Sequence, residues 1–401
     1  PPKKLKKSDE TIDNKEINQP KIVDNKLPHI RDIIIPKDLT NGTFCKIVSW
    51  NVAGLRAVLR NNPKILENLV NKHDIDILCL QETKLQSPDD IKDDILSNYN
   101  GYWVYSEKKK GYSGVVIFIK KSILLSNTFV DNKLKKKHKQ LTLTNSWNKS
   151  NELENNTLNN TEQVTESNES SPLIVNSISY ELEDSRFTGE GRTITIDLGM
   201  FYLVGCYVPN SGQNLERLDY RVNEWDPYMR DYLHNLKITK PVIFFGDLNV
   251  GHLDLDIHNP TAKHIVKQSG LTPQERNSMT IFLSNGFTDA FRFLYPDARG
   301  AFTYWSQRTS ARPYNKGIRL DYFICSNDMF ADPIVTDNKT SDSDINNASN
   351  KRSLDEISEK LLSPRAVENI PIPGVYDSYI LHEDTVGVSD HCPVVLVVKL
   401  K

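Results

Sequence analysis

The chain has 401 residues, 25% of them charged, and its formal net charge is −2. This near-neutral balance excludes a polycation that binds nucleic acid with its whole surface, so any basic binding surface must be local. The length allows two average domains or one large domain with insertions. No apolar run approaches the roughly 18 residues that a membrane span needs, and the five cysteines form no CxxC pair. This pattern favours reduced core thiols over a disulfide framework or a zinc site.

Three stretches have compositions typical of disorder. Residues 1–42 begin with PPKKLKK and show no hydrophobic period, so we expect a disordered basic tail. Its lysines are either a nuclear-import or nucleic-acid signal or simply a solvated end. Residues 126–185 and 337–365 are rich in Asn, Ser and Thr and poor in aromatic residues, which predicts two disordered low-complexity insertions. Residues 43–401 would then form a single domain that is interrupted twice.

The remaining segments alternate between strand and helix patterns. In chain order we expect a strand at 45–52, a helix at 63–70, strands at 76–80, 103–105 and 114–119, a hairpin of 193–197 with 200–208, a helix at 216–236, a strand at 242–245, a helix at 273–285, and strands at 301–305, 319–326 and 392–400. The helix at 273–285 has Thr272 as its cap, Pro273 at its first position and Glu275 beyond. Strand–helix alternation mixed with hairpins predicts a two-sheet α/β sandwich.

Polar side chains end several of the predicted strands. The stretch PVIFFGDLNVG at 241–251 is an apolar run, typical of a strand buried on both faces, that ends in Asp247 and Asn249. These two side chains lie on one side of a strand because strand side chains alternate. A turn would explain this motif alone, but acids, amides or a histidine stand beside other strand-like runs as well. Together they predict a hard-cation and general-base site at the rim of a sheet core.

Eight motifs stand in a specific order along the chain. They are WNVAGLRA at 50–57, LQETK at 80–84, GYSGV at 111–115, YVPNSG at 207–212, GDLNV at 246–250, GLTPQER at 270–276, RLDYF at 319–323 and SDHCP at 389–393. In this order they resemble exonuclease III-type apurinic/apyrimidinic (AP) endonucleases, part of the endonuclease/exonuclease/phosphatase superfamily. The resemblance covers about residues 44–125, 186–336 and 371–400. It implies a DNase I-like fold: a four-layer α/β sandwich of two packed mixed β-sheets flanked by helices.

The resemblance implies a Mg²⁺ cofactor, for which Mn²⁺ would substitute. Glu82 resembles the main magnesium ligand, helped by Asn51 and Asp390, and oxygen ligands of this kind suit Mg²⁺. The residues implied to surround the metal are Asn51, Glu82, Asp247, Asn249, Asp390 and His391.

The resemblance also implies which residues act on the phosphodiester. Asp247 resembles the base that orients or deprotonates the attacking water, with Asn249 in support. His391, paired with Asp321, resembles the histidine that binds the scissile phosphate, where a protonated imidazole would stabilise negative charge. Tyr207 also corresponds to a phosphate-contacting residue. A core histidine, a strand-end acid and a packed aromatic are simpler explanations for single residues, but they do not explain all the motifs in family order.

Further residues correspond to DNA contacts of the family. Arg56 and Lys84 would hold backbone phosphates, which gives sequence-independent, salt-dependent binding, and Asn210 also points to the phosphate. Gln213 and Arg308 occupy the positions of residues that wedge into the duplex on either side of the lesion. Because Arg308 is long and charged, the wedge here would become a phosphate or groove contact.

A small apolar sugar pocket is implied for Tyr304, Ile318 and Leu320. A pocket too narrow for a base would select a base-less sugar by exclusion. Two residues depart from the family pattern: Ile318 replaces an aromatic that is common in animal members, and Ala53 stands where many relatives carry Asp or Asn. The metal shell would therefore be missing one oxygen.

The expected reaction is base-excision repair: hydrolysis of the phosphodiester 5′ to an abasic site in double-stranded DNA, with some 3′–5′ exonuclease and 3′-phosphodiesterase activity. One alternative is another metal-dependent phosphoesterase of the superfamily, such as a general DNase, a sphingomyelinase or an inositol-phosphate phosphatase. Another is a catalytically silent DNA-binding protein, although Glu82, Asp247 and His391 are all present. We expect a monomer with no membrane partner, located in the nucleus or in a DNA-containing organelle.

Overall fold

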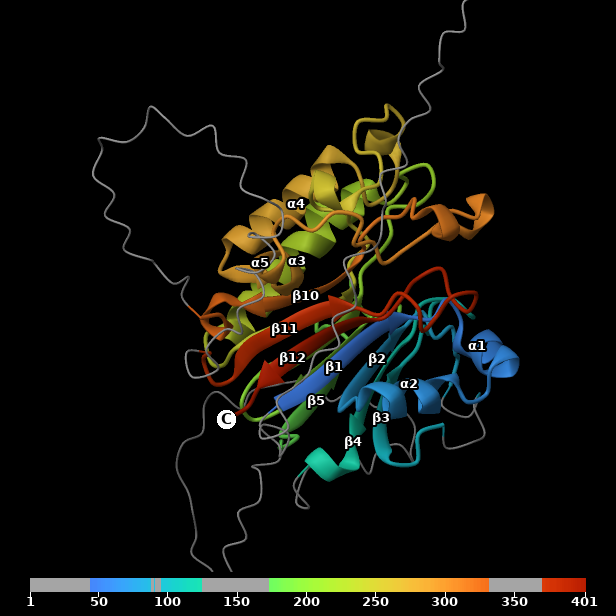
Figure 1. Cartoon of the computed structure of the whole chain (residues 1–401). Coiled ribbons are helices and arrows are strands. Elements are labelled where there is room, and N and C mark those ends of the chain that lie inside the picture. The colour runs from blue at the N-terminus through green and yellow to red at the C-terminus, as the bar shows by residue number, and fades with distance from the viewer. Residues whose placement is uncertain (1–43, 88–89, 91–94, 125–172, 332–369) are drawn as a thin grey trace, which may run out of the picture.

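Two six-stranded mixed sheets form the centre of the molecule (Figure 1). The computed structural model describes residues 44–87, 90, 95–124, 173–331 and 370–401, and the predicted tail 1–42 and insertion 337–365 lie outside them. The strand order is β11-β12-β1-β2-β4-β3 in the first sheet and β5-β6-β7-β8-β10-β9 in the second. The strands of the first sheet are β1 (Phe44–Asn51), β2 (Ile77–Gln81), β3 (Tyr99–Val104), β4 (Val115–Lys120), β11 (Gly374–Ile380) and β12 (Val394–Lys399). Those of the second are β5 (Ser177–Tyr180), β6 (Thr193–Asp197), β7 (Tyr202–Tyr207), β8 (Val242–Asp247), β9 (Phe287–Asp289) and β10 (Asp321–Ser326).

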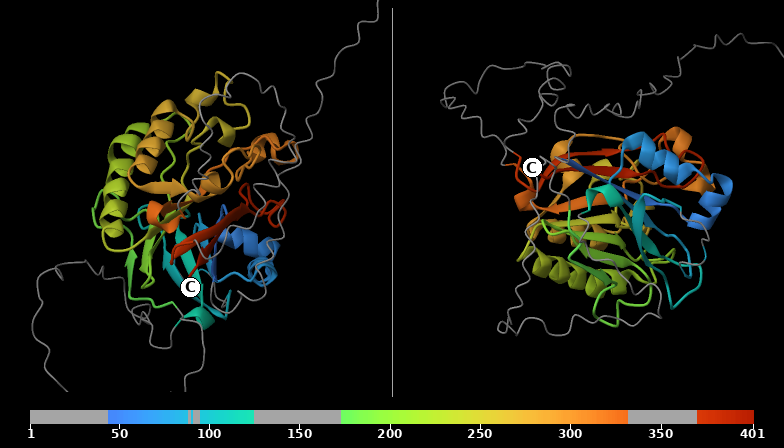
Figure 2. Two further views of the ribbon diagram at one scale, coloured as in Figure 1. Left: turned by 60° about the vertical axis from the view of Figure 1, so that its left-hand side comes forward. Right: turned by 90° about the horizontal axis from the view of Figure 1, so that it is seen from below.

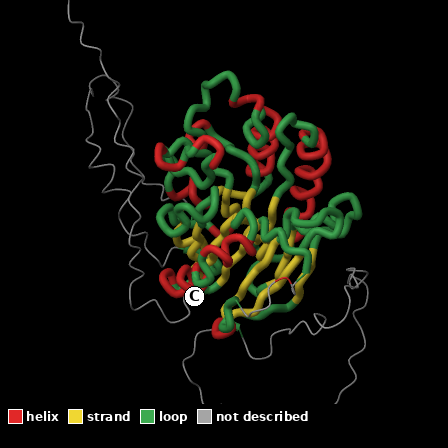
Figure 3. Tube along the Cα trace, turned by 90° about the vertical axis from the view of Figure 1, so that its right-hand side faces the viewer, coloured by secondary structure: helices red, strands yellow, loops and turns green. Residues whose placement is uncertain are grey.

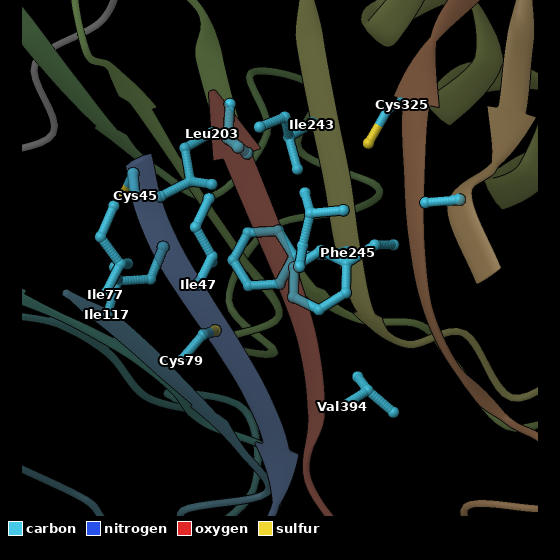
Figure 4. Packing of buried hydrophobic residues seen from close by; sticks show 14 of the residues in the cluster. Cys45, Ile47, Ile77, Cys79, Ile117, Leu203, Ile243, Phe245, Cys325 and Val394 are labelled. Atoms are coloured by element: carbon cyan, nitrogen blue, oxygen red, sulfur yellow. The ribbon is translucent and has the colours of Figure 1, made fainter. Parts of the chain in front are cut away.

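The two sheets repeat one arrangement. The third and fourth strands of each sheet are parallel, β1 with β2 and β7 with β8, and the other neighbouring strands are antiparallel. Apolar side chains from the facing sides of the sheets fill the space between them, as Figure 4 shows for Ile47 and Cys79 of the first sheet and Leu203 and Phe245 of the second. This inter-sheet core fixes how the strand ends of the two sheets meet.

Helices cover the outer face of each sheet (Figure 2). α1 (Leu55–Asn61) and α2 (Ile65–His73) pack on the first sheet through a buried cluster that includes Trp50 and Leu66. α3 (Asp226–Lys237) and α4 (Pro273–Ser284) pack on the second sheet, and the short α5 (Ala290–Leu294) lies beside β11 and β10. Figure 3 shows the strands in the middle with helices on both sides. The predicted four-layer sandwich is confirmed.

Several local predictions are confirmed and others are wrong. Thr272 and Glu275 form the predicted capping box of α4. The helix expected at 216–236 instead begins as a π-helix, Tyr220–Trp225, and continues as α3. The strand expected at 301–305 is not one, because this segment makes only isolated bridges and joins no ladder. Single 3₁₀ turns occur at Lys121–Ile123, Asp254–Asp256, Ile265–Lys267, Gln307–Thr309, Arg312–Tyr314 and Asn327–Met329.

The predicted insertion at 126–185 extends too far at its C-terminal end, because ordered structure begins again at Leu173. Residues 125–172 lie outside the described residues, but Leu173 is buried and bridges to Leu124. β5 follows and pairs along its whole length with β6. Serine alternates with Ile178 and Tyr180 along β5, so the two apolar side chains point toward the inter-sheet core. This short alternation is not recognised from the sequence because the preceding residues are polar. No helix in the described part of the chain is long and apolar enough to cross a membrane.

Candidate active site

The site lies where strands of both sheets end, at the rim of the inter-sheet core. Ile47 of β1 and Phe245 of β8 point into that core. Because strand side chains alternate, Asn51 and Asp247, four and two residues further on, face the same space. A side chain at Gly246 is excluded, since its Cβ would lie 1.9 Å from the carbonyl oxygen of Cys206 and its φ is 136°. This glycine therefore lets β8 approach β7 closely just before Asp247.

Asn51 connects two carboxylates from different strands. Its Nδ2 donates to Glu82 Oε1 at 3.0 Å and to Asp247 Oδ2 at 2.9 Å. Its Oδ1 accepts the backbone N–H of Ala53 at 2.9 Å. Asn51 is fully buried, so both hydrogens of its amide are used inside the site. The amide thereby fixes the distance between Glu82 and Asp247.

A second chain of hydrogen bonds holds Asp247 from the other side. The backbone N–H of Asn249 donates to Asp247 Oδ1 at 2.9 Å. Asn249 Oδ1 accepts from Asn210 Nδ2 at 2.9 Å, and its Nδ2 donates to the carbonyl of Val208 at 2.9 Å. Asn210 itself is exposed. The YVPNSG and GDLNV motifs therefore meet in space, and the exposed Asn210 is rigidly connected to the buried Asp247.

His391 and Asp321 form a buried pair beside Asp247: Asp321 is the partner of Asp247 in the β8–β10 ladder, and His391 comes from the loop before β12. His391 Nδ1 lies 2.8 Å from Asp321 Oδ2, and its Nε2 lies 3.9 Å from Asp247 Oδ2. The ring of Tyr304 lies 5.0 Å from the imidazole, centroid to centroid. The imidazole thus stands between two carboxylates, with one nitrogen bound and the other facing the site.

The surroundings of Asp247 and His391 raise the pKa values of both groups. Burial raises the pKa of the Asp247 carboxyl to about 7, with Asp321 and Glu82 adding to the rise and His391 opposing it. Burial alone would lower the pKa of His391, but Asp321 and Asp247 outweigh it and raise that pKa to about 10. The imidazole therefore favours its protonated form, and the Asp247 carboxylate accepts a proton more readily than an ordinary carboxylate. That combination suits proton transfer to Asp247 and charge stabilisation by His391.

The loop that carries Glu82 and the turn between β1 and α1 have an unusual backbone. Ala53, Glu82 and Lys84 all have left-handed φ values, 51°, 50° and 54°. Such conformations cost residues other than glycine roughly 1–3 kcal/mol each and gather at functional sites. Hydrogen bonds hold the loop: Lys84 N donates to the carbonyl of Ser113 at 2.8 Å and Thr83 N to that of Gly114 at 3.1 Å. The LQETK and GYSGV motifs therefore support each other.

The donor set at Glu82 fits a hard cation. Glu82 Oε2 lies 3.0 Å from Lys84 Nζ at the partly exposed edge of the site. The chain next to Asp390 is bound to the strand that carries Asn51, because the Ser389 hydroxyl donates to the carbonyl of Asn51 at 2.8 Å. Within the described ranges, no three His, Cys, Asp or Glu side chains are close enough to hold a metal by themselves. Two carboxylates with water completing the shell would suit Mg²⁺.

Tyr207 is buried beside Glu82, and a residue that the sequence did not single out holds it in place. Burial and the charges of Glu82 and Asp247 raise the pKa of the Tyr207 hydroxyl well above its usual value, so this group stays protonated. The buried guanidinium of Arg192 lies over the Tyr207 ring, with its Cζ 5.0 Å from the ring centroid. Its Nη1 donates to the backbone carbonyl of Tyr207 at 3.0 Å. Arg192 precedes a strand without a polar motif around it, so no sequence signal marked it.

The residues predicted to bind DNA surround this cluster at different depths. Arg56, Gln213 and Arg308 are exposed on α1 and on two loops. Tyr304 pairs with Ile318 on one side and with His391 on the other through isolated bridges. Of the three residues predicted to line a sugar pocket, Tyr304 and Ile318 are half-buried and Leu320 is buried. Tyr304 is the one that contacts His391.

Comparisons with known proteins place the chain in a family. The sequence pattern of the Endonuclease/Exonuclease/phosphatase family matches residues 48–391. The chain is 37% identical over 298 residues to "DNA repair nuclease APEX1" of Danio rerio, covering 73% of this chain and 76% of that protein. It is 35% identical over 284 residues to an "Exodeoxyribonuclease" of Bacillus subtilis, covering 71% and 89%. The crystal structure of AP endonuclease LMAP from Leishmania major matches with a TM-score of 0.60 at 26% identity, covering 91% and 90%.

The chain therefore belongs to the endonuclease/exonuclease/phosphatase family, and within it to the exonuclease III-type AP endonucleases.

Proposed function

We propose that the protein hydrolyses the phosphodiester 5′ to an abasic site in double-stranded DNA with the help of Mg²⁺ or Mn²⁺. The single observation that carries this proposal is the place of Asp247: a buried carboxylate 2.9 Å from Asn51 and 3.9 Å from the imidazole of His391. A carboxylate with a pKa near neutrality beside a protonated histidine is the pair that water attack on a phosphate needs.

Asp247 is the general base in this proposal. Asn249 and Asn51 each bind one of its oxygens, so the carboxylate is oriented before substrate arrives. The water that attacks phosphorus gives its proton to this carboxylate. The bond from phosphorus to the 3′ oxygen of the preceding nucleotide breaks, and that oxygen takes up a proton from solvent. The products are a 3′-hydroxyl and a 5′-deoxyribose phosphate.

His391 binds the phosphate in this proposal. Its Nε2–H faces the site while Asp321 holds Nδ1, so the charged imidazole is kept in one orientation. Negative charge that develops on the phosphate oxygens is stabilised by this cation, a contribution that is large in a site that excludes water. The protonated Tyr207 hydroxyl is a second donor to the same oxygens.

Glu82 and Asp390 would hold the divalent cation, which supplies positive charge that offsets the charge of the phosphate and of the leaving oxygen. Lys84 already neutralises one oxygen of Glu82, which lets the site stay assembled at low metal concentration. Asn51 then acts as the donor that orients Glu82 and Asp247.

Selection of the lesion rests on the apolar residues beside His391. A base-less sugar is turned out of the duplex at low cost, because no base pair is lost. Tyr304, Ile318 and Leu320 would contact this sugar and leave no room for a base. The same site, placed at a DNA 3′ end, would give a 3′–5′ exonuclease activity, and the Bacillus relative is named an exodeoxyribonuclease.

A substrate panel tests the proposal. The protein is incubated with a duplex that carries one tetrahydrofuran abasic analogue, with the same duplex intact, and with a soluble inositol phosphate, each with and without Mg²⁺. Incision confined to the analogue strand and dependent on the metal is the expected result. Release of phosphate from the inositol compound, or equal cutting of both duplexes, would instead support a phosphatase or a general DNase.

A further inference from the structure

The buried pair of Asp321 and His391 joins the two sheets. Asp321 is the first residue of β10 in the second sheet, and His391 lies three residues before β12 in the first. No ladder connects these strands. Their side chains nevertheless meet at 2.8 Å, and a backbone connection between the two sheets at this point comes from a segment outside both strands.

Residues 303–305 make that connection. Tyr304 forms isolated bridges with both Ile318 and His391. On the second sheet's side, the N–H groups of Thr303 and Tyr304 donate to the carbonyl of Ile318 at 3.0 and 2.9 Å. On the first sheet's side, Cys392 N donates to the carbonyl of Thr303 at 2.8 Å. This short segment is therefore bonded to both halves of the site.

The side chain of Thr303 makes the closest link to Asp321. Its Oγ1 accepts the backbone N–H of Leu320 at 2.9 Å and that of Asp321 at 3.1 Å. Thr303 is fully buried, so water cannot replace the hydroxyl as acceptor. The β8–β10 ladder pairs Asp321 with Asp247. Thr303 adds a second connection, because its side chain binds the backbone N–H of Asp321 and its carbonyl binds the backbone after His391.

The carboxylate of Asp321 depends on this support. Its Oδ2 contacts His391, whereas Oδ1 is buried without a hydrogen-bond partner among the described residues. With only one hydrogen bond to the carboxylate, the direction in which Asp321 Oδ2 points depends strongly on the position of the Asp321 backbone. A shift of that backbone would turn His391 away from the position of the phosphate.

We propose that Thr303 is a positioning residue for catalysis: its hydroxyl holds the backbone of Asp321 so that the Asp321–His391 pair is aligned with Asp247. The inference rests on the proposed function, because it concerns how that site is aligned. It predicts that loss of this hydroxyl lowers kcat far more than it raises KM, because His391 stabilises the charge that develops on the phosphate and is only one of several DNA contacts.

The matched variants are Thr303→Val, which keeps the shape but lacks the acceptor, and Thr303→Ser, which keeps the acceptor. Misplacement by about 1 Å costs roughly 10²-fold in rate, so Thr303→Val should lower kcat about 10- to 100-fold on the abasic-analogue duplex, with KM within about twofold of the wild type. Thr303→Ser should restore most of the rate.

Thr272→Val is the control for stability. Thr272 is equally buried and its hydroxyl also accepts a backbone N–H, that of Glu275 at 3.2 Å, but it caps α4 away from the pair. Its loss should lower the melting temperature and leave kcat unchanged. If Thr303→Val does not fold, Thr303→Cys replaces it, because a thiol is a weak acceptor of similar size, and the same fall in kcat is expected.

An NMR measurement tests the inference without substrate. In protein labelled with ¹⁵N-histidine, the Nδ1–H signal of His391 is identified by its absence from His391→Asn. It should weaken or shift in Thr303→Val and persist in Thr303→Ser. An unchanged signal and unchanged kcat in Thr303→Val would overturn the role of Thr303. Failure of the wild type to incise, with the signal changing as expected, would overturn only the proposed function.

Discussion

The Nζ atom of Lys84 lies 3.0 Å from Oε2 of Glu82, and both residues have left-handed backbone conformations. The chain turns sharply after β2. This turn brings the ammonium group of Lys84 onto the carboxylate of Glu82, two residues earlier in the sequence. Lys84 also donates to the carbonyl of Ala53 at 3.2 Å. A positive group thus neutralises part of the carboxylate that we propose as the metal ligand.

Glu82→Gln tests that assignment. The Lys84 and Glu82 side chains are 38% and 19% exposed, and ion pairs of this kind contribute about 0–1 kcal/mol, so the melting temperature should change little. Incision supported by Mg²⁺ should fall at least about 100-fold, because the neutral amide binds a hard cation weakly. Activity would be measured against Mg²⁺ concentration, and a curve identical to that of the wild type would rule Glu82 out as the ligand.

Ala53→Asp should strengthen the metal site. The left-handed φ of 51° at Ala53 suits Asp better than Ala, so the change should not lower stability. An added ligand, direct or through water, is typically worth about 10–100-fold in metal affinity, and the Mg²⁺ concentration for half-maximal incision should fall by that order. The gain with Mn²⁺ should be smaller.

The exposed Ala57 on α1 provides the control for net charge near the site. Ala57→Asp adds the same charge without reaching Glu82, so its Mg²⁺ titration should match the wild type. Overlapping titrations of wild type and Ala53→Asp for both metals would show that Ala53 is only a tolerated residue.

Much of the site followed from the sequence because its polar residues end strands. However, the predicted alternation of Asp247 and Asn249 along one strand is wrong. β8 ends at Asp247, and Asn249 follows in a loop with a left-handed φ of 48°, where its backbone N–H donates to Asp247 Oδ1. The motif order supplied Asn51, Glu82 and His391. Thr303 could not be found in this way, since its role depends on hydrogen bonds to residues 17 and 18 positions away. The local pattern of residues 301–305 predicts a strand, but in the structure this segment connects the two sheets. Local periodicity carries no information about such long-range contacts.

A buried ion network behind the site should govern stability in acid. Asp256 Oδ1 accepts from Arg319 Nε at 2.8 Å and from Arg292 Nη2 at 2.6 Å, and all three side chains are buried. Burial alone would raise the pKa of Asp256, but the two arginines lower it to about 2. With an unfolded value of about 3.9, the stabilisation is present above pH ~4 and is lost as the pH falls toward ~2. It amounts to about 2–3 kcal/mol by linkage.

Asp256→Asn should accordingly cost about 3 kcal/mol or more at pH 7, since Arg292 loses this carboxylate and Arg319 keeps only its pair with Asp289. Asp254→Asn is the matched control: its partner Arg276 lies at 2.6 Å, but the Asp254 side chain is 69% exposed, so the loss should be below about 1 kcal/mol. Urea unfolding at pH 7 and pH 3 measures both. Equal losses for the two variants would contradict the importance of the buried network.

The boundary at β5 can be tested by two deletions. Removing residues 131–170 with a short Gly/Ser join deletes no motif residue and should leave single-turnover incision unchanged. Removing 131–180 also deletes Leu173 and β5, which pairs with β6, and should lower the melting temperature by several degrees. Equal melting temperatures would mean that β5 adds nothing to the second sheet, and loss of folding in the shorter deletion would show that the tract has a structural role.

The position and the chemistry of the cut test the proposed reaction most directly. Single-turnover incision of the tetrahydrofuran duplex in H₂¹⁸O with Mg²⁺, followed by mass spectrometry, identifies both new ends. Water attack at phosphorus with Asp247 as base predicts a 3′-hydroxyl on the upstream fragment and one ¹⁸O in the 5′ phosphate of the downstream fragment, with the rate reduced at least about 10³-fold in Asp247→Asn. A cut on the 3′ side of the analogue, a phosphate without ¹⁸O, or full activity of Asp247→Asn would contradict this mechanism.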